Sequence, residues 1–340
     1  MLQKKTMSAK TGFKIDTKKI FVKHPFAQYI LNELKKHGFE AVLIGGVVRD
    51  AVRARLNRDS NFEPEEVDIA TSALPAEIKR LFKKHRLVEV GEAFGVLKIL
   101  SAEGKAYEVA TFRIEGEYDG RWPGEVKLVR TQEEDIQRRD LTINGLAANE
   151  DGTVLDYVGG IRDLEHKIIR TIGNPQERFE EDHLRMLRAI RFACVIDGQI
   201  EKETANAIQQ NAKKLAKISK ERIRDELFAL LETPRAVKGF QLLDQHGLLE
   251  IIMPELTATK GISQQEKYHP EGDVFTHTLL ALEEADKRRF EPLVKLAIAL
   301  HDIGKPIAYE RHNGKHAGGH EVIGEALARK VCRRWRWSSE

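Results

Sequence analysis

Two carboxylates stand one residue apart in the segment EVDIAT, residues 66–71. Because alternate residues of a β-strand point to one face, a strand here would present Glu66 and Asp68 side by side. Paired carboxylates repel each other unless a cation lies between them, and hard divalent ions prefer oxygen ligands. The pair therefore predicts a metal site suited to phosphoryl transfer, with a solvated acidic strand face as the alternative. Glu108, on a later strand-like segment, could supply a third carboxylate.

Two adjacent glycines follow the apolar segment Ala41–Ile44 and precede a helical pattern. Glycine lets a backbone turn sharply and approach a ligand closely, and the amides at a helix N-terminus can hold phosphate oxygens. Gly45 and Gly46 could therefore form a nucleotide-phosphate site, to which Arg49, one helical turn on, would add a bidentate contact. A plain tight turn is the commoner explanation of a glycine pair, so the motif does not identify the site by itself.

Two further segments are dense in charged residues. The first, RRDLTIN at residues 138–144, suits contact with ribose and phosphate, whereas a cluster of surface salt bridges is the alternative. In the second, EDHLRMLRAIRF, helical spacing places Glu181, Arg185 and Arg188 in one stripe on the helix surface. Asp182 lies beside this stripe. Aspartate accepts amino protons and arginine donates paired ones, so this group could read the edge of a nucleobase. Ion pairs along a wet helix would explain the same spacing.

Histidines gather near the end of the chain, where an adjacent His-Asp pair is followed by Gly-Lys. The residues concerned are His277, His301, Asp302, His316 and His320. An adjacent His-Asp pair flanked by histidines from other helices predicts a metal-binding set, although any single histidine would be structural by default.

These candidate residues lie on two kinds of sequence pattern. From residue 25 to 165 helical and strand-like segments alternate, which predicts an α/β or α+β domain. The expected helices are 25–38 and 75–84, and the expected strands are 41–44, 67–70, 95–100 and 107–111. From about 175 to 255, and again beyond 265, the pattern is mostly helical.

The composition is that of a folded, non-membrane chain. Hydrophobic residues make up 41% and charged residues 32%, which excludes collagen-like and wholly disordered proteins. No run of 18 apolar residues and no secretory signal pattern is present, so we expect no membrane partner. Cys194 and Cys332 lie far apart, so we expect no disulfide and a cytoplasmic location.

The net charge of +3 is unevenly distributed. Residues 1–24 contain seven lysines and one acid, whereas the remaining residues carry 49 basic and 52 acidic side chains. We expect the N-terminal segment to be a flexible, solubilising tail, with a phosphate-attracting arm as the alternative.

Taken in order, the motifs resemble the class II tRNA nucleotidyltransferase (CCA-adding enzyme) family, which also contains the bacterial poly(A) polymerases. The resemblance covers about residues 25–335 and rests on IGGVVRD, VDIATSA, EVATFR, EYDGRWP, RRDLTING, DYVGGIRDL, RTIGNP and EEDHLRMLRAIRFA. It implies an α+β fold, in which a polymerase-β-like nucleotidyltransferase head domain precedes all-helical neck, body and partial HD-type domains. The implied boundaries are 1–24 for the flexible tail, 25–170 for the head, 171–260 for neck and body, and 261–340 for the HD-type region.

The resemblance also implies a function and roles for residues. The family adds C and A from CTP and ATP to the tRNA 3′ end without a nucleic-acid template. Glu66 and Asp68 would be catalytic and would hold Mg²⁺. The implied nucleotide-binding residues are Gly45, Gly46, Arg49, Arg139, Asp182, Arg185 and Arg188, of which Asp182 and Arg185 would bond to the base edge. The C-terminal histidines resemble an HD-type phosphohydrolase, whose second divalent metal would bind His277, His301, Asp302 and His320.

Two departures from the family keep alternatives open. The first metal ligand is usually aspartate, and the extra methylene of Glu66 moves its oxygens by more than about 1 Å, to which phosphoryl transfer is sensitive. The chain ends at Glu340, before the final aspartate of an HD domain and before the family's tail domain, so we expect an incomplete HD region. The alternatives are a poly(A) polymerase, a weakly active RNA-binding relative and an HD-type hydrolase. The segment Val90–Val96 lacks the arginine-rich pattern of the polymerases and favours the tRNA branch.

Overall fold

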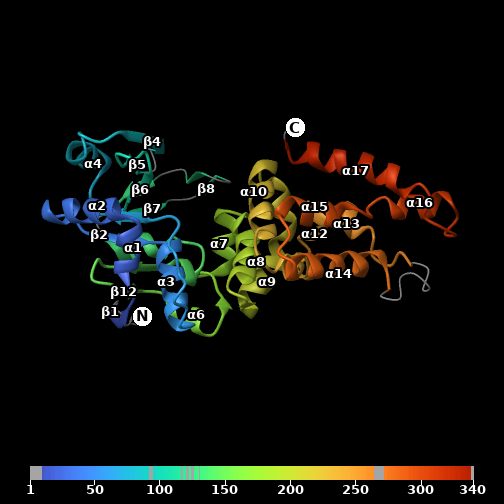
Figure 1. The fold of residues 1–340 in the computed structure, drawn as a ribbon, viewed down its shortest axis with the longest axis horizontal. Helices are drawn as coiled ribbons and strands as arrows, with labels where there is room; N and C mark the ends of the chain where they lie inside the picture. Colours follow the sequence, from blue (N-terminus) through green and yellow to red (C-terminus); the bar gives the residue numbers. More distant parts are fainter. Residues whose placement is uncertain are drawn as a thin grey trace. The chain divides into compact units, whose positions relative to one another are not determined.

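The computed structural model describes most of the chain (Figure 1). The described residues are 10–91, 95–115, 118–119, 122–123, 126–129, 131–263 and 272–337. The chain divides into two compact units, Met1–Asn174 and Pro175–Glu340. Within the described ranges no helix is long and apolar enough to cross a membrane. Residues 92–94 and part of the EYDGRWP motif, on which two of the sequence arguments depend, lie outside these ranges.

The first unit is built on an eight-stranded sheet in the order β1-β12-β11-β2-β3-β6-β5-β4. Its strands are β1 (Lys10–Lys14), β2 (Ala41–Ile44), β3 (Asp68–Thr71), β4 (Leu87–Gly91), β5 (Val96–Leu100), β6 (Ala106–Thr111), β11 (Leu146–Ala148) and β12 (Thr153–Asp156). β3 and β6 are parallel, and every other neighbouring pair is antiparallel. All four residues of β2 are buried, as expected for a short apolar strand at the centre of a sheet.

The first unit has six α-helices among its described residues. They are α1 (Thr17–Lys23), α2 (Pro25–Lys36), α3 (Gly46–Leu56), α4 (Pro75–Leu81), α5 (Gln132–Gln137) and α6 (Gly160–Glu165). Of these, α2, α3 and α4 lie where the sequence predicted helices. α2 and α4 each begin with a proline, whose fixed φ suits the first helical turn. Ile30, Leu31 and Leu34 of α2 are fully buried, so the helix places its apolar face on the sheet. The predicted α+β head domain is therefore confirmed.

The prediction of a flexible tail over residues 1–24 was wrong for residues 10–24. β1 pairs with β12, and the carboxylate of Asp16 accepts the N–H of Lys18 at the start of α1. Ile20 and Phe21 are buried, so α1 contributes apolar side chains to the core of the unit. Residues 10–24 thus belong to the head domain, because burial of these two side chains outweighs the solvation of the lysines. Residues 1–9 lie outside the described ranges.

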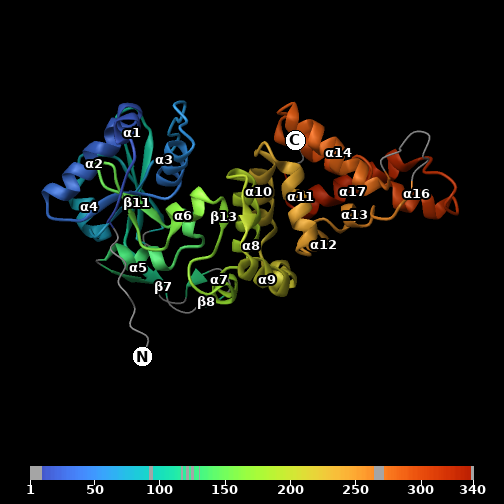
Figure 2. The same cartoon turned by 90° about the horizontal axis from the view of Figure 1, so that it is seen from below.

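The second unit is helical apart from the two-residue strand β14 (Gln199–Ile200). Its helices are α7 (Pro175–Glu181), α8 (Arg185–Val195), α9 (Lys202–Asn211), α10 (Lys220–Leu231), α11 (Ala236–Gln245), α12 (Leu249–Ile252), α13 (Pro254–Thr257), α14 (Val274–Lys287), α15 (Pro292–Leu300), α16 (Lys305–Arg311) and α17 (His320–Arg334). Figure 2 shows α8 beside α10 and α11, and its side chains pack against both. Nearly all of its residues are buried for that reason.

The predicted division at residue 260 falls inside this unit. Asp286 of α14 accepts the backbone N–H of Val237 in α11 at 2.9 Å, and its other oxygen pairs with Lys295 of α15 at 2.8 Å. Lys295 is 2% exposed and donates to the carbonyls of Leu231 and Thr233. These buried polar contacts connect the predicted body to the predicted HD-type region, so the two form one compact unit.

Candidate active site

The glycine pair forms the turn between β2 and α3. Gly45 has a φ of +75°, which favours glycine, and Gly46 is the first residue of α3. A Cβ built on Gly45 would lie 3.5 Å from Oδ2 of Asp68, so this turn passes directly beside the carboxylate. The predicted strand–glycine–helix segment is therefore present, and it adjoins the predicted metal pair.

Three carboxylates approach one another at this end of the sheet. Asp68 begins β3 and pairs across the sheet with Ile44 on one side and with Glu108 on the other. Burial, Glu108 and then Glu66 raise the pKa of Asp68 to about 6. Val67 is buried and Glu66 is exposed, so the predicted alternation along this segment is confirmed. The donor set is thus negative and only partly solvated, which is what a hard divalent cation requires.

A cavity of about 390 Å³ brings these elements together. It is lined by Gly46 and Arg49 of α3, by Glu66 and Asp68, and by Phe62 in the loop that precedes β3. The phosphate-binding motif and the acidic pair, predicted separately, therefore line one cavity within the head domain. This arrangement could hold a metal–triphosphate group.

Arg49 is held in place by residues that the sequence did not identify individually. Its Nη1 donates to Oδ1 of Asn144 at 3.0 Å, and its Nε and Nη2 donate to the carboxylate of Asp50 at 2.9 and 2.6 Å. Asn144 in turn donates to Asp140 at 3.1 Å. The polar segment RRDLTIN therefore orients the arginine of the segment IGGVVRD. The signal for Asn144 was its place inside that motif, and its burial explains why its amide needs partners.

Arg139 is positioned by a buried acid of α5. Both Nε and Nη2 of Arg139 bond to Oδ2 of Asp135, at 3.3 and 3.1 Å, and Arg138 bonds to Oδ1. Burial opposes ionisation of Asp135, but Arg139 and Arg138 outweigh it and hold its pKa below the ordinary value. Arg139 is also near enough to oppose the rise in the pKa of Asp68.

The raised pKa of Asp68 predicts a pH-dependent stability effect. In the unfolded chain an aspartate has a pKa near 3.9, so the folded protein binds more protons between about pH 4 and 6 and loses stability as the pH rises through that range. Asp68→Asn should therefore stabilise the metal-free protein at pH 7.5, by up to about 3 kcal/mol relative to its effect at pH 4. Thermal unfolding of both proteins at both pH values measures this difference in stability. At pH 7.5 excess Mg²⁺ should reduce the difference, because the ion would bind and stabilise the wild type and not the variant. A stability difference that does not change with pH would contradict the assignment.

The predicted base-reading residues lie in the second unit, and their helix is not continuous. α7 ends at Glu181 and α8 begins at Arg185, so the single stripe expected from helical spacing was wrong. Asp182 lies in the break, where its Oδ1 accepts the N–H of Leu184 at 3.0 Å. The same carboxylate receives two bonds from Arg222 of α10, at 3.1 and 2.6 Å. These bonds stabilise Asp182 outside a helix and fix the direction of its carboxylate.

The two predicted arginines are also tied to the second unit. Arg185 is mostly buried and bonds to Glu181 and to the carbonyl of Arg178. Arg188 bonds to Glu226 at 3.4 Å, and its guanidinium lies 5.5 Å from the ring centroid of Phe192. Asp182, Arg185 and Arg188 thus lie around the start of α8, each with its own polar partner, while the other predicted nucleotide-binding residues belong to the first unit.

The predicted HD residues converge around one carboxylate. Candidate ligand atoms of His277, His301 and Asp302 lie within 4.8 Å of one another, and Nε2 of His320 lies 3.4 Å from Oδ1 of Asp302. Burial raises the pKa of Asp302, but hydrogen bonds from His301 and Lys305 outweigh it and hold that pKa well below its ordinary value.

The glycine after the His-Asp pair allows this convergence. A Cβ built on Gly304 would lie 2.2 Å from the carbonyl oxygen of His320, so only glycine lets α17 begin so close to the His-Asp segment. Among the described residues, His277, His301 and Asp302 form the three-ligand group that could hold a metal.

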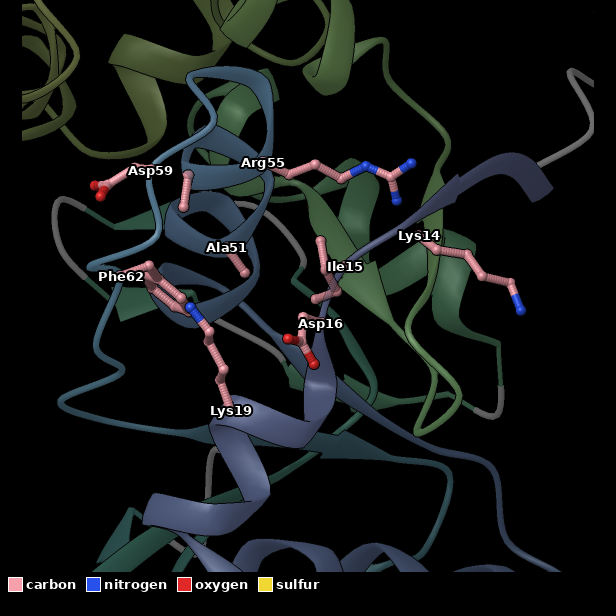
Figure 3. Close-up of a pocket in the computed structure, with 9 residues that line it drawn as sticks. Lys14, Ile15, Asp16, Lys19, Ala51, Arg55, Asp59 and Phe62 are labelled. Atoms are coloured by element: carbon pink, nitrogen blue, oxygen red, sulfur yellow. The ribbon is translucent and has the colours of Figure 1, made fainter.

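Two further cavities of the head domain are lined by more basic than acidic side chains, the acids being Asp16 and Asp59 in one and Glu63 in the other. The first, about 390 Å³, is lined by Lys14, Lys19 and Arg55, and the second, about 600 Å³, by Lys18, Lys19 and Lys23. Lys19 extends from α1 toward the loop that carries Phe62, where it donates to the carbonyl of Ser60 at 2.7 Å (Figure 3). Phe62 lines both basic cavities as well as the acidic one, so all three adjoin this residue.

The fold and this site define a nucleotidyltransferase head domain followed by a helical unit. Residues 41–170 match the family described as "Poly A polymerase head domain", and residues 199–260 match "Probable RNA and SrmB- binding site of polymerase A". The motif-based resemblance to the tRNA nucleotidyltransferase and poly(A) polymerase family is thereby confirmed.

Curated proteins and a solved structure that are similar to this chain are CCA-adding enzymes. The CCA-adding enzyme of Bacillus licheniformis is 44% identical over 220 residues, which cover 64% of this chain and 53% of that enzyme. That of Geobacillus kaustophilus is 44% identical over 240 residues, covering 70% of this chain and 57% of that enzyme. The solved Bacillus stearothermophilus CCA-adding enzyme in complex with CTP is 29% identical with a TM-score of 0.58, covering 91% of this chain and 81% of that one. The chain spans about half the length of the curated relatives it matches.

Proposed function

We propose that the chain is a template-independent tRNA nucleotidyltransferase, which adds C, A or both from CTP and ATP to the tRNA 3′ end. The observation that carries this proposal is the cavity that joins Gly46 and Arg49 to Glu66 and Asp68. In the proposed reaction the RNA 3′ oxygen bonds to the α-phosphorus of the nucleotide, and pyrophosphate leaves. The CCA-adding enzymes named above support the choice of substrates, since one of them is 44% identical to this chain over 220 residues and another is solved in complex with CTP.

The carboxylates fit a divalent cation, and Mg²⁺ is the proposed cofactor. Like charges around a partly buried Asp68 raise its pKa, and a cation between Glu66 and Asp68 would relieve that repulsion. Bound there, magnesium would neutralise charge on the nucleotide phosphates and favour the attacking form of the RNA hydroxyl. Glu108, paired with Asp68 across β3 and β6, would keep the site negative and could supply a third carboxylate.

The chain's own residues would bind and orient the nucleotide. Amides at the N-terminus of α3 would accept the triphosphate, and Arg49 would contact it from a position fixed by Asn144 and Asp50. Arg139, fixed by Asp135, would contact the ribose or phosphates. In the second unit the proposed base-reading groups are Asp182 and Arg185, with Arg188 supporting them.

The RNA backbone would be bound by the basic cavities beside Phe62. Lys18, Lys19 and Arg55 line cavities that share Phe62 with the acidic one, so phosphates next to the RNA 3′ end could be neutralised there. Contacts of this kind recognise the backbone rather than the sequence, as expected for an enzyme that accepts many tRNAs.

Separate incubations with each labelled nucleotide test the proposed function. The protein is mixed with Mg²⁺ and a tRNA that lacks its 3′ CCA, and product lengths are read on a gel. Addition of C and then A supports the proposal, and chelation of Mg²⁺ with EDTA should abolish it. Long A tails would instead identify a poly(A) polymerase. Retained tRNA binding without incorporation would identify a weakly active RNA-binding relative.

A second candidate function, a metal-dependent phosphohydrolase, is favoured by the convergence of His277, His301, Asp302 and His320. His301→Ala should abolish tight Mn²⁺ binding by the second unit, because it removes a ligand of the group. His312→Ala, at a half-buried histidine outside the group, is the matched control. Isothermal titration measures the binding, and phosphate release from a 2′,3′-cyclic nucleotide measures the activity. Equal Mn²⁺ binding by both variants would remove this function from consideration.

A further inference from the structure

The head domain carries an aromatic cavity outside the candidate active site. Residues at the start of α2, after α4 and in the turn between β5 and β6 enclose about 700 Å³. Phe26 and Tyr29 stack with ring centroids 5.5 Å apart, and the ring of His85 lies 5.1 and 5.5 Å from theirs. Figure 1 shows α2 and α4 on the side of the domain where β4, β5 and β6 lie. We call this site, formed by Phe26, Tyr29, Lys84, His85 and Arg86, the aromatic pocket.

Cations flank the rings of the aromatic pocket. Lys84 and Arg86 are exposed, line the cavity on either side of His85, and face a single lining acid, Glu103. No carboxylate of the described residues forms an ion pair with Lys84 or Arg86. Lys105, in the adjoining turn, is exposed as well. The pocket therefore combines apolar ring faces with a net positive charge.

Tyr29 packs one side of its ring on the buried Phe82 and leaves part of the side chain exposed. Its neighbours Ile30 and Leu31 are fully buried against the sheet, whereas Tyr29 is 41% exposed. Exposed aromatic faces beside lysine and arginine are the features with which proteins bind single-stranded nucleic acid, because bases stack on rings while cations take the phosphates. We propose that the aromatic pocket binds an unpaired nucleobase of the RNA substrate, with its flanking phosphates on Lys84 and Arg86.

The aromatic pocket and the candidate catalytic carboxylates lie on opposite faces of the same sheet. Asp68 pairs with Glu108 on β6, Glu108 pairs with Lys98 on β5, and Leu100, two residues further along β5, lines the pocket. Two strand spacings and two residues along β5 place Leu100 about 12 Å from Asp68. Tyr107, whose ring lies 5.5 Å from that of Phe26, precedes Glu108 in β6, so the rings lie on the other face from the carboxylates. An RNA whose 3′ end reaches Asp68 would pass around the β5–β6 turn to place a nucleotide at Tyr29. This inference rests on the proposed function for the identity of the ligand as RNA.

Two variants of the full chain test the aromatic pocket. Tyr29→Leu keeps apolar bulk but removes the ring, and should weaken binding of CCA-less tRNA by about five- to a hundredfold. Lys84→Gln with Arg86→Gln should lower the slope of log affinity against log salt by about 1.4, the value for two phosphate contacts on a single strand. Tyr29→Phe retains the ring and should bind like the wild type. Val88→Ala, at an exposed residue of β4, is the control for a surface change nearby. Fluorescence anisotropy measures each affinity, so the result does not depend on catalysis.

The outcomes separate this inference from the proposed function. The proposal that the aromatic pocket binds RNA would be overturned if Tyr29→Leu binds RNA as tightly as the wild type. It would also be overturned if Tyr29→Phe loses as much affinity as Tyr29→Leu. A raised KM for ATP or CTP with unchanged RNA affinity would also overturn it, since the pocket would then serve the free nucleotide. Failure of the wild type to incorporate any nucleotide would remove the proposed function, whereas the difference in RNA affinity would still report on the pocket.

Discussion

Replacing Asp68 with alanine is expected to reduce nucleotide incorporation by about a thousandfold or more. Charge stabilisation by a catalytic metal contributes several kcal/mol to a phosphoryl-transfer transition state, and about 4 kcal/mol corresponds to a thousandfold in rate. The substitution should not unfold the domain, because it removes a carboxylate whose pKa is raised by burial and by Glu108. Initial rates with labelled CTP and CCA-less tRNA measure the effect. Full activity in Asp68→Ala would refute the metal assignment.

The matching change at the other ligand should have the opposite result. Glu66→Asp shortens the side chain by one methylene and restores the Asp-x-Asp pattern of the family, so turnover should stay the same or rise. Asp151→Ala, at an exposed acid of the same domain outside the cavity, is the control for loss of a surface charge. A strong loss of rate in Glu66→Asp would mean that this cavity is built around the longer side chain.

Much of the head domain follows from short-range sequence patterns. The apolar run Ala41–Ile44, the glycines after it and the alternation around Asp68 predicted β2, the turn and the carboxylate pair, because each depends on neighbours within a few residues. The segment Lys10–Lys14 shows no such pattern. It becomes a strand through pairing with β12, more than 130 residues away, so its lysines were misread as a solvated tail.

The supporting contacts of the site were beyond the reach of local patterns. Asn144 lies 95 residues from Arg49, and nothing in the spacing of either segment indicates that they bond. The break between α7 and α8 has the same origin. The segment around Asp182 has helical periodicity, but its carboxylate accepts a local N–H and two bonds from Arg222, 40 residues away. Long-range polar contacts thus decided both features.

Replacing Asp182 with alanine is expected to change which nucleotide is added more than whether one is added. A pair of hydrogen bonds to a base edge contributes about 1–3 kcal/mol of discrimination, so preference for CTP and ATP over UTP and GTP should fall about 10- to 100-fold. Competition between labelled nucleotides at equal concentration measures this ratio. Arg222→Ala should give a smaller loss of preference, because the carboxylate remains but is no longer oriented.

A structural role for Asp182 would have a different signature. Loss of its carboxylate leaves Arg222, a partly buried guanidinium, without this partner, so some loss of stability accompanies the change. Asp225→Ala, which removes an exposed acid from the Arg224 pair on the same helix, is the matched control and should leave the nucleotide preference intact. If Asp182→Ala lowers incorporation of all four nucleotides by the same factor, the carboxylate only supports the helix break. A selective loss for CTP and ATP requires that it contacts the base.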